Sequence, residues 1–263
     1  MNHASASGQT TLIKAAQDGN TECVRMLIRN KTNLESIDNN GTTALIWAAL
    51  SGNTACVQLL IDAKAKVDIG DNEDMTALLW AAHNGRRESL ECLLRAKADI
   101  DATDFSGGNA ILWAVFFGHA ACVELLLRSG ADENSRNGNS DTALMVAARE
   151  RYPRCAEILI AAKADLDAKN DDDENALTLA LEHRDKSCAR LLIAAKVDID
   201  ARINDDDSVL IAAARRGDIE GVQILIAARA DISAQNYIGE TALIAAVTQD
   251  HPDCVQLLLD ARA

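Results

Sequence analysis

Cysteines are the residues of this chain whose chemistry would first suggest disulfide bonds or a metal site. The chain has seven of them, and six share one position in a pattern that recurs every 33 residues. These six are Cys23, Cys56, Cys122, Cys155, Cys188 and Cys254. The sequence has no Cys-x-x-Cys pair and no cysteine/histidine cluster, the usual signs of a metal site. We therefore predict no bound metal and no cofactor.

Motifs that would indicate an enzyme are also missing from the sequence. The five histidines are scattered. There is no Gly-rich phosphate loop, no G-x-S-x-G and no H-E-x-x-H. The sequence therefore predicts no catalytic residues and a protein that is not an enzyme.

Two acidic runs form a secondary acidic patch, which we expect on adjacent turn tips. Its members are Asp171, Asp172, Asp173, Glu174, Asp205, Asp206 and Asp207. A calcium loop needs ligands at spaced positions, a turn-making glycine and a bidentate glutamate. A contiguous run lacks that order, so metal binding is the least favoured interpretation. The patch is otherwise a solvated tip or a contact for a basic partner.

Large aromatic residues are the other group that could serve binding. The three tryptophans, Trp47, Trp80 and Trp113, are 33 residues apart. The three phenylalanines, Phe105, Phe116 and Phe117, fall close together. Aromatic side chains are typical anchors of protein interfaces. The alternative is that the tryptophans pack on each other and on the turns, filling gaps between repeats.

A 33-residue period positions all these residues and runs through nearly the whole chain. Its most regular position is held by Leu12, Leu45, Leu78, Ile111, Leu144, Leu177, Leu210 and Leu243. A period of this length indicates a stacked repeat architecture. Each unit predicts a polar turn, a short Ala-rich helix, a break such as Gly52-Asn53, and a second helix. After a polar leader at 1–8, the domain spans 9–263, with repeats at about 9–37, 38–70, 71–103, 104–136, 137–169, 170–202, 203–235 and 236–263.

Every predicted first helix starts with a residue that can cap it. The residues two positions before the regular leucine or isoleucine are Thr10, Thr43, Thr76, Asn109, Thr142, Asn175, Ser208 and Thr241. The side-chain oxygen of each can accept from a free backbone N–H of the first helical turn. The caps therefore support eight helix starts.

The pattern resembles the ankyrin repeat over about residues 9–263. It shares the period, the T-x-L core of T-P-L-H-x-A, the following Ala-Ala, the glycine between helices and the V-x-x-L-L second helix. The resemblance implies an all-α solenoid of stacked helix-turn-helix repeats with β-turn or hairpin fingers. It also implies a non-enzymatic scaffold that binds another protein through its concave groove and turn tips.

Two departures from the family pattern carry structural expectations. The family histidine is replaced by residues such as Ile13, Ile46 and Leu79, so we expect its polar tie to a loop to be absent and apolar packing to replace it. The glycine between the helices becomes Arg151, Arg184 or Asp250 in three repeats. If the backbone there is left-handed, each side chain costs roughly 1–2 kcal/mol.

The stacked architecture assigns the cysteines to the core. Equivalent residues of adjacent repeats should lie about 10 Å apart, beyond the roughly 7 Å that a disulfide allows between Cα atoms. We therefore expect small, buried, reduced thiols, with Cys92 also in the core, and a reducing compartment, cytoplasmic with the nucleus not excluded.

Charge and hydropathy exclude several classes of partner. The formal net charge of −14 argues against nucleic acid and against anionic membrane surfaces. The longest apolar run, residues 110–117, is too short to cross a bilayer. The first residues show no apolar signal region. These features predict a protein partner, with no nucleic acid and no membrane insertion.

The family's partner-contacting face, carried over position by position, gives the candidate binding site. It comprises Trp47, Leu50, Trp80, His83, Phe105, Trp113, Phe116, Phe117 and Arg149. Aromatic residues dominate repeats two to four, and charged residues continue the face beyond them. We expect an apolar or aromatic partner segment in the aromatic part.

The last repeat is the least like a capping unit. Its second helix, residues 254–259, is as apolar as an internal one, whereas terminal repeats normally carry a polar outer face. Three interpretations of this apolar helix remain open. More protein follows it, or this end contacts a partner or another copy of the chain, or the end is simply frayed. The alternative functions are a regulatory segment of a larger enzyme or channel and a self-associating repeat protein.

Overall fold

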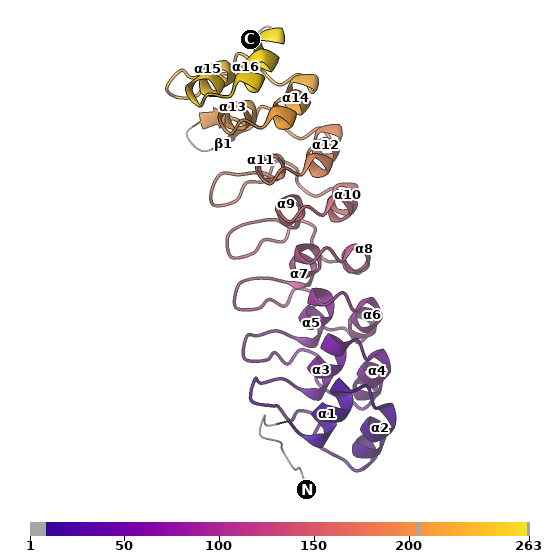
Figure 1. Cartoon of the computed structure of the whole chain (residues 1–263). Helices are drawn as coiled ribbons and strands as arrows, with labels where there is room; N and C mark the ends of the chain where they lie inside the picture. Colours follow the sequence, from indigo (N-terminus) through magenta and orange to yellow (C-terminus); the bar gives the residue numbers. More distant parts are fainter. Residues whose placement is uncertain (1–8, 204–205, 262–263) are drawn as a thin grey trace. The chain divides into compact units, whose positions relative to one another are not determined.

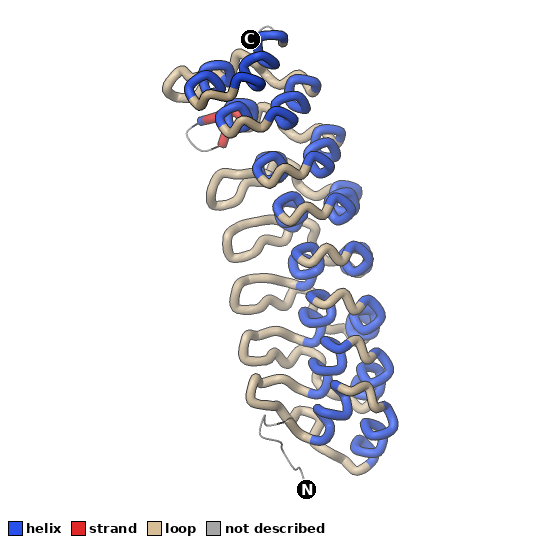
Figure 2. The backbone as a smooth tube through the Cα atoms, in the orientation of Figure 1, coloured by secondary structure: helices blue, strands red, loops and turns tan. Residues whose placement is uncertain are grey.

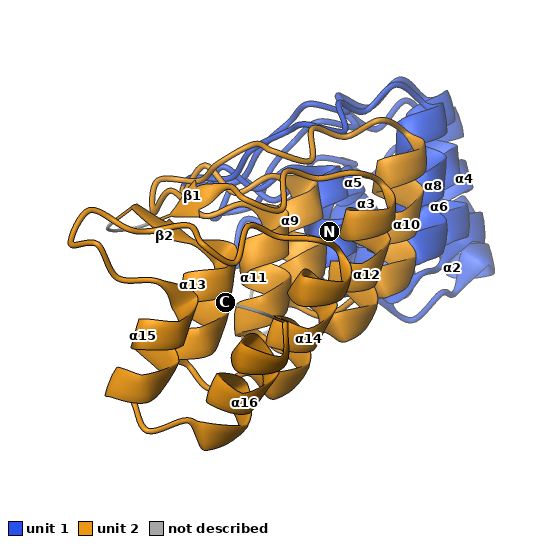
Figure 3. Ribbon diagram, turned by 90° about the horizontal axis from the view of Figure 1, so that it is seen from above, with its two compact units in different colours: residues 1–138 blue, residues 139–263 orange. Residues whose placement is uncertain are grey.

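The computed structural model describes residues 9–203 and 206–261. It divides into two compact units, residues 1–138 and 139–263 (Figure 3). The predicted leader at 1–8 lies outside the described residues, as does Asp205 of the acidic patch. The boundary between the units falls inside the predicted fifth repeat.

Within the described residues, sixteen helices alternate between a shorter and a longer type (Figure 1). The first helices of the pairs are α1 (Thr11–Gln17), α3 (Ala44–Ser51), α5 (Ala77–His83), α7 (Ala110–Phe116), α9 (Ala143–Arg149), α11 (Ala176–Glu182), α13 (Val209–Arg215) and α15 (Ala242–Thr248). The second helices are α2 (Thr21–Arg29), α4 (Thr54–Asp62), α6 (Arg87–Arg95), α8 (Ala120–Arg128), α10 (Pro153–Ala161), α12 (Lys186–Ala194), α14 (Ile219–Ala227) and α16 (Pro252–Asp260). The predicted solenoid of helix-turn-helix repeats is confirmed.

Each unit is built from two layers of helices. In unit 1, α1, α3, α5 and α7 pack in one row, and α2, α4, α6 and α8 pack in a second row against it. Unit 2 repeats the arrangement with α9, α11, α13 and α15 in one row and α10, α12, α14 and α16 in the other. Long loops project from the first row in both units (Figure 2), and we call them fingers.

Side-chain caps fix the start of all eight first helices, as the sequence predicts. The hydroxyl of Thr43 accepts from the N–H of Ile46 at 3.3 Å, and Oδ1 of Asn175 accepts from Thr178 at 2.9 Å. The same cap occurs at Thr10, Thr76, Asn109, Thr142, Ser208 and Thr241. Each cap satisfies one of the backbone donors that a helix start leaves free.

The fingers are hairpins held by one carboxylate or amide at their base. Asp38 Oδ1 accepts from the N–H groups of Asn40 and Thr42 at 2.9 and 3.0 Å. Asp71 and Asp104 make the same pair of bonds two and four residues ahead. One finger also contains a short antiparallel pair, β1 (Arg202–Ile203) with β2 (Asp207–Ser208). The finger conformation therefore places an acidic side chain beside its first helix.

The turn between paired helices is left-handed whether or not glycine occupies it. Gly52 has φ 77° and Gly85 has φ 64°, and Arg151, Arg184 and Asp250 have φ 65°, 56° and 57°. The three non-glycine turns therefore keep the shape of the glycine turns. The strain expected for a side chain in this conformation remains at these positions.

The cysteines are free thiols, but two of them depart from the expected burial. Cys56, Cys122, Cys155, Cys188 and Cys254 are buried, as predicted. Cys92 is only half-buried and Cys23 is exposed. Cys23 belongs to the first described helix pair, where no preceding described pair covers it. Burial raises the pKa of Cys122 and of Cys155 to about 11, so both stay protonated near neutral pH.

Candidate functional site

Each tryptophan is tied to the finger of its own repeat. Trp47 Nε1 donates to Asp38 Oδ2, Trp80 Nε1 to Asp71 Oδ2, and Trp113 Nε1 to Asp104 Oδ2, each at 2.8 Å. Apolar residues at the family-histidine position, Ile46, Leu79 and Leu112, are buried as expected, but the tryptophans supply a bond between helix and finger that the sequence did not predict. The donor is a tryptophan two residues after the regular leucine or isoleucine, whereas the family histidine would stand one residue after it.

The aspartate that accepts from each indole also accepts hydrogen bonds from the backbone of its finger. Asp71 Oδ1 holds the finger backbone through Glu73 and Met75, while Oδ2 accepts from Trp80. A hydrogen bond to an ionised carboxylate is stronger than one between neutral groups. The indole edge is thereby fixed, and the three tryptophans are half-buried rather than fully packed or fully exposed.

Five rings from α5, α7 and the residue after α7 form one aromatic cluster: Trp80, His83, Trp113, Phe116 and Phe117. His83 lies at its centre, with ring centroids 5.2 Å from Trp80, 5.2 Å from Trp113 and 4.2 Å from Phe117. Phe116 and Phe117 meet edge-on at 5.1 Å. Burial, and then the nearby His119, lower the pKa of His83, which favours its neutral form within the cluster.

The two phenylalanines stay substantially exposed despite these contacts. Phe116 is 42% exposed and Phe117 is 38% exposed. Phe105, on the finger of repeat four, is 74% exposed and makes no ring contact with the cluster within the described residues. The sequence-predicted residues Trp80, His83, Trp113, Phe116 and Phe117 are thus brought together, and Phe105 is not.

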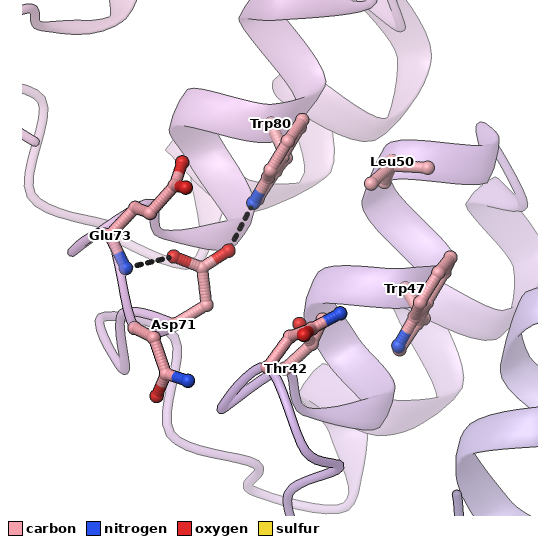
Figure 4. A pocket seen from close by; sticks show the side chains of 8 residues that line it. Thr42, Trp47, Leu50, Asp71, Glu73 and Trp80 are labelled. Atoms are coloured by element: carbon pink, nitrogen blue, oxygen red, sulfur yellow. Dashed lines mark hydrogen bonds between the residues drawn. The ribbon is translucent and has the colours of Figure 1, made fainter. Parts of the chain in front are cut away.

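A hollow of about 460 Å³ lies beside the cluster, between Trp47 and Trp80 (Figure 4). Its lining comprises Asn40, Thr42, Trp47, Leu50, Asp71, Asn72, Glu73 and Trp80. In the view of Figure 4, Leu50 lies above Trp47 and to the side of Trp80, and Asp71 lies below Trp80. The sequence prediction included Leu50 and both tryptophans but missed the finger residues Asp71 and Glu73.

Arg149 has a structural role that the sequence did not predict. It belongs to unit 2, where its guanidinium contacts both oxygens of the buried Asp141 at 2.5 and 3.0 Å. Asn170 Nδ2 donates to the same carboxylate at 2.9 Å. A buried carboxylate left unpaired would be costly. Arg149 therefore neutralises Asp141, and its contact with a partner stays a prediction.

The acidic patch is smaller than predicted. Asp207 is buried, paired with Arg215 and bonded by Asn236. Glu174 is half-buried, with its carboxylate 3.2 Å from Asn170 Nδ2. Both side chains point back toward helices, and at the base of their fingers they accept hydrogen bonds from neighbouring side chains. Asp171, Asp172, Asp173 and Asp206 remain exposed. Within 9–203 and 206–261, no three His, Cys, Asp or Glu residues are grouped so that they could hold a metal ion.

A second exposed apolar surface lies on α15. Ile244 is 49% exposed and Val247 is 60% exposed. The equivalent residues of the preceding repeat, Ile211 and Ala214, are fully buried in unit 2, where α13 packs against α15. We call Ile244 and Val247 the α15 face.

Comparison with known families agrees with the fold. Models described as ankyrin repeats (3 copies) match residues 1–71, 66–137 and 111–205, and one described as ankyrin repeats (many copies) matches 210–259. No curated protein matches the chain. None of the described helices is long and apolar enough to pass through a lipid bilayer. Proteins of this family are typically non-enzymatic and generally mediate protein–protein interaction. The chain belongs to the ankyrin repeat family.

Proposed function

We propose that this chain is a non-enzymatic scaffold that holds a protein partner on one face of unit 1. That aromatic face consists of Trp47, Leu50, Trp80, His83, Trp113, Phe116 and Phe117. The observation that carries the proposal is the exposure of Phe116 and Phe117 within a cluster of five contacting rings. Contiguous exposed apolar surface usually marks an interaction site.

The energetics favour a partner over water at this face. A partner that covers the exposed parts of Phe116 and Phe117 removes apolar area from water, which stabilises the complex. The rings lose little freedom on binding because neighbouring rings already restrict them. Aromatic anchors in such packed settings each contribute about 2 kcal/mol or more when truncation to alanine is measured.

The experiment compares capture by three versions of the chain. The wild type, Phe116→Ala/Phe117→Ala and Tyr237→Ala are immobilised and exposed to cell lysate, after matching by helical circular dichroism and thermal melting. Tyr237 is a suitable control because it is 69% exposed and lies in unit 2. We expect a protein retained by the wild type and by Tyr237→Ala, and lost from the double variant. Equal retention by all three would contradict the proposal.

The α15 face supports a second candidate function, which is contact with another helical repeat. Within unit 2, the residues equivalent to Ile244 and Val247 are covered by the first helix of the next repeat. The surface therefore fits a helix of that type, supplied by a following repeat of a longer chain or by another copy. Light scattering over a concentration series should show a rising mass for the wild type and not for Val247→Glu. A constant monomer mass for both would remove this candidate.

A further inference from the structure

We propose that the hollow between Trp47 and Trp80 receives an arginine side chain of the bound partner. This inference rests on the proposed function, because it names the partner chemistry that the aromatic face selects. It concerns one part of that face, bounded by α3, α5 and the fingers that precede them. The argument combines the shape of the hollow, its charge and the chemistry of its walls.

The walls of the hollow are held in place before any ligand arrives. Trp47 is fixed by Asp38 and Trp80 by Asp71, each through its indole N–H at 2.8 Å. The two rings stand on neighbouring first helices that pack together. A site whose walls are already ordered loses less conformational entropy on binding. The hollow is therefore suited to a flat group placed against an indole.

One residue difference explains why this gap is open and the next one is closed. Three positions after each tryptophan stand Leu50, His83 and Phe116. The ring of His83 contacts both Trp80 and Trp113 at 5.2 Å and fills the space between them. Leu50 has no ring, and Trp47 makes no ring contact with any described residue. The space between Trp47 and Trp80 consequently remains available to a ligand.

The charge of the lining favours a cation. Asp71 and Glu73 contribute carboxylates, and none of the eight described residues that line the hollow is basic. Glu73 is exposed, and its carboxylate has no hydrogen-bond partner among the described residues. An apolar ligand that covered the Glu73 carboxylate would remove it from water without giving it a partner, which is unfavourable. A cation would instead pair with Glu73 while lying against an indole face.

Arginine matches these walls better than lysine does. Its guanidinium is planar and stacks on aromatic faces, and its fork of N–H donors pairs with both oxygens of one carboxylate. Lysine offers a compact ammonium without a flat face. Glu73 at the rim and Trp80 in the wall would together contact the charge and the plane of one guanidinium.

The test follows the indole N–H signals by NMR during titration with single amino-acid derivatives. The chain has three tryptophans, so the signals are assigned with single Trp→Phe variants. The probes are N-acetyl-arginine amide, its uncharged analogue N-acetyl-citrulline amide, and N-acetyl-lysine amide, each to on the order of 50 mM. We expect saturable shifts of Trp47 and Trp80 with the arginine probe, no saturable shift with citrulline, and weaker binding of lysine. Trp113 should shift least.

Two matched variants test the role of charge. Glu73→Gln should weaken the arginine probe by about two- to fivefold, as expected for a partly exposed ion pair. Asp74→Asn removes the same charge from the adjacent exposed residue and should leave binding within error. Equal shifts by arginine and citrulline, tighter binding of lysine, or no shift of Trp47 and Trp80 would overturn the inference. Those results would not contradict the proposed function, because the capture experiment tests Phe116 and Phe117, which do not line the hollow.

Discussion

The indole N–H of Trp80 donates to Asp71 Oδ2 at 2.8 Å, nine residues back along the chain. Because Asp71 also accepts from two finger N–H groups, this bond joins the first helix to the finger that precedes it. The same relation holds for Trp47 with Asp38 and for Trp113 with Asp104. Three successive repeats therefore couple finger geometry to the position of an indole.

Removing Asp71 should destabilise unit 1. Asp71→Ala deletes a carboxylate that accepts from Glu73 N, Met75 N and Trp80 Nε1. Hydrogen bonds to a charged group contribute about 1.5–3 kcal/mol, and we expect a loss of about 2–3 kcal/mol in the free energy of unfolding. Urea unfolding followed by tryptophan fluorescence measures it. Glu73→Ala, at an exposed site of the same finger, is the control and should lose less than about 0.5 kcal/mol.

Relieving the strained turn of repeat six should stabilise the chain. Arg184 is exposed and has φ 56°, a conformation that costs a side chain roughly 1–2 kcal/mol. Because glycine loses more entropy on folding, we expect Arg184→Gly to gain only about 1 kcal/mol. Arg184→Ala keeps the Cβ and should not gain. A gain with alanine equal to that with glycine would show that strain is not the cause.

The half-buried His83 should give unit 1 a pH-dependent stability. The pKa of His83 is lowered from its ordinary value of 6.5, first by burial and then by His119. The unfolded chain therefore binds the proton more readily, so this contribution is fully present above about pH 6.5 and is lost as pH falls toward the lowered pKa. Unfolding free energies measured from pH 7 to 5 should decline less in His83→Gln than in the wild type. His183→Gln, at an exposed position, should follow the wild type.

Thiol reactivity should separate Cys23 from the buried cysteines. The thiolate is the reactive form, and burial raises the pKa of Cys122 and Cys155 to about 11. With an aromatic disulfide reagent at pH 8, the native chain should show a fast phase from the exposed Cys23 and none from the buried thiols until it is unfolded. Cys23→Ser should lose the fast phase. Persistence of that phase would show that another thiol is accessible.

Local signals were sufficient to predict the repeats. A cap such as Thr43 and the left-handed turn at Gly52 depend on residues within a few positions of each other. Phe116 and Phe117 were predicted as members of the candidate binding face, and both rings are exposed. These features depend on residues that lie close together in the sequence.

Features that depend on how a finger folds back were not predicted. Asp71 reaches Trp80 only because the finger hairpin returns to the start of its helix. Asp207 stands in an acidic run, yet it is buried against Arg215 because it lies at the base of its finger rather than at the tip. The signal that could have revealed the hollow was Leu50 at the position of His83, read together with the fingers on either side.

The central claim, that a partner lies on the aromatic face, is tested most directly by a photoreactive amino acid placed on that face. The residue p-benzoylphenylalanine would replace Phe116 in one version of the chain and Ile219 in another, because these sites are similarly exposed at 42% and 40% and Ile219 lies in unit 2. Irradiation with the captured partner should give a cross-linked product from position 116 and little from position 219. Cross-linking that is absent at 116, or equal at the two positions, would contradict the claim.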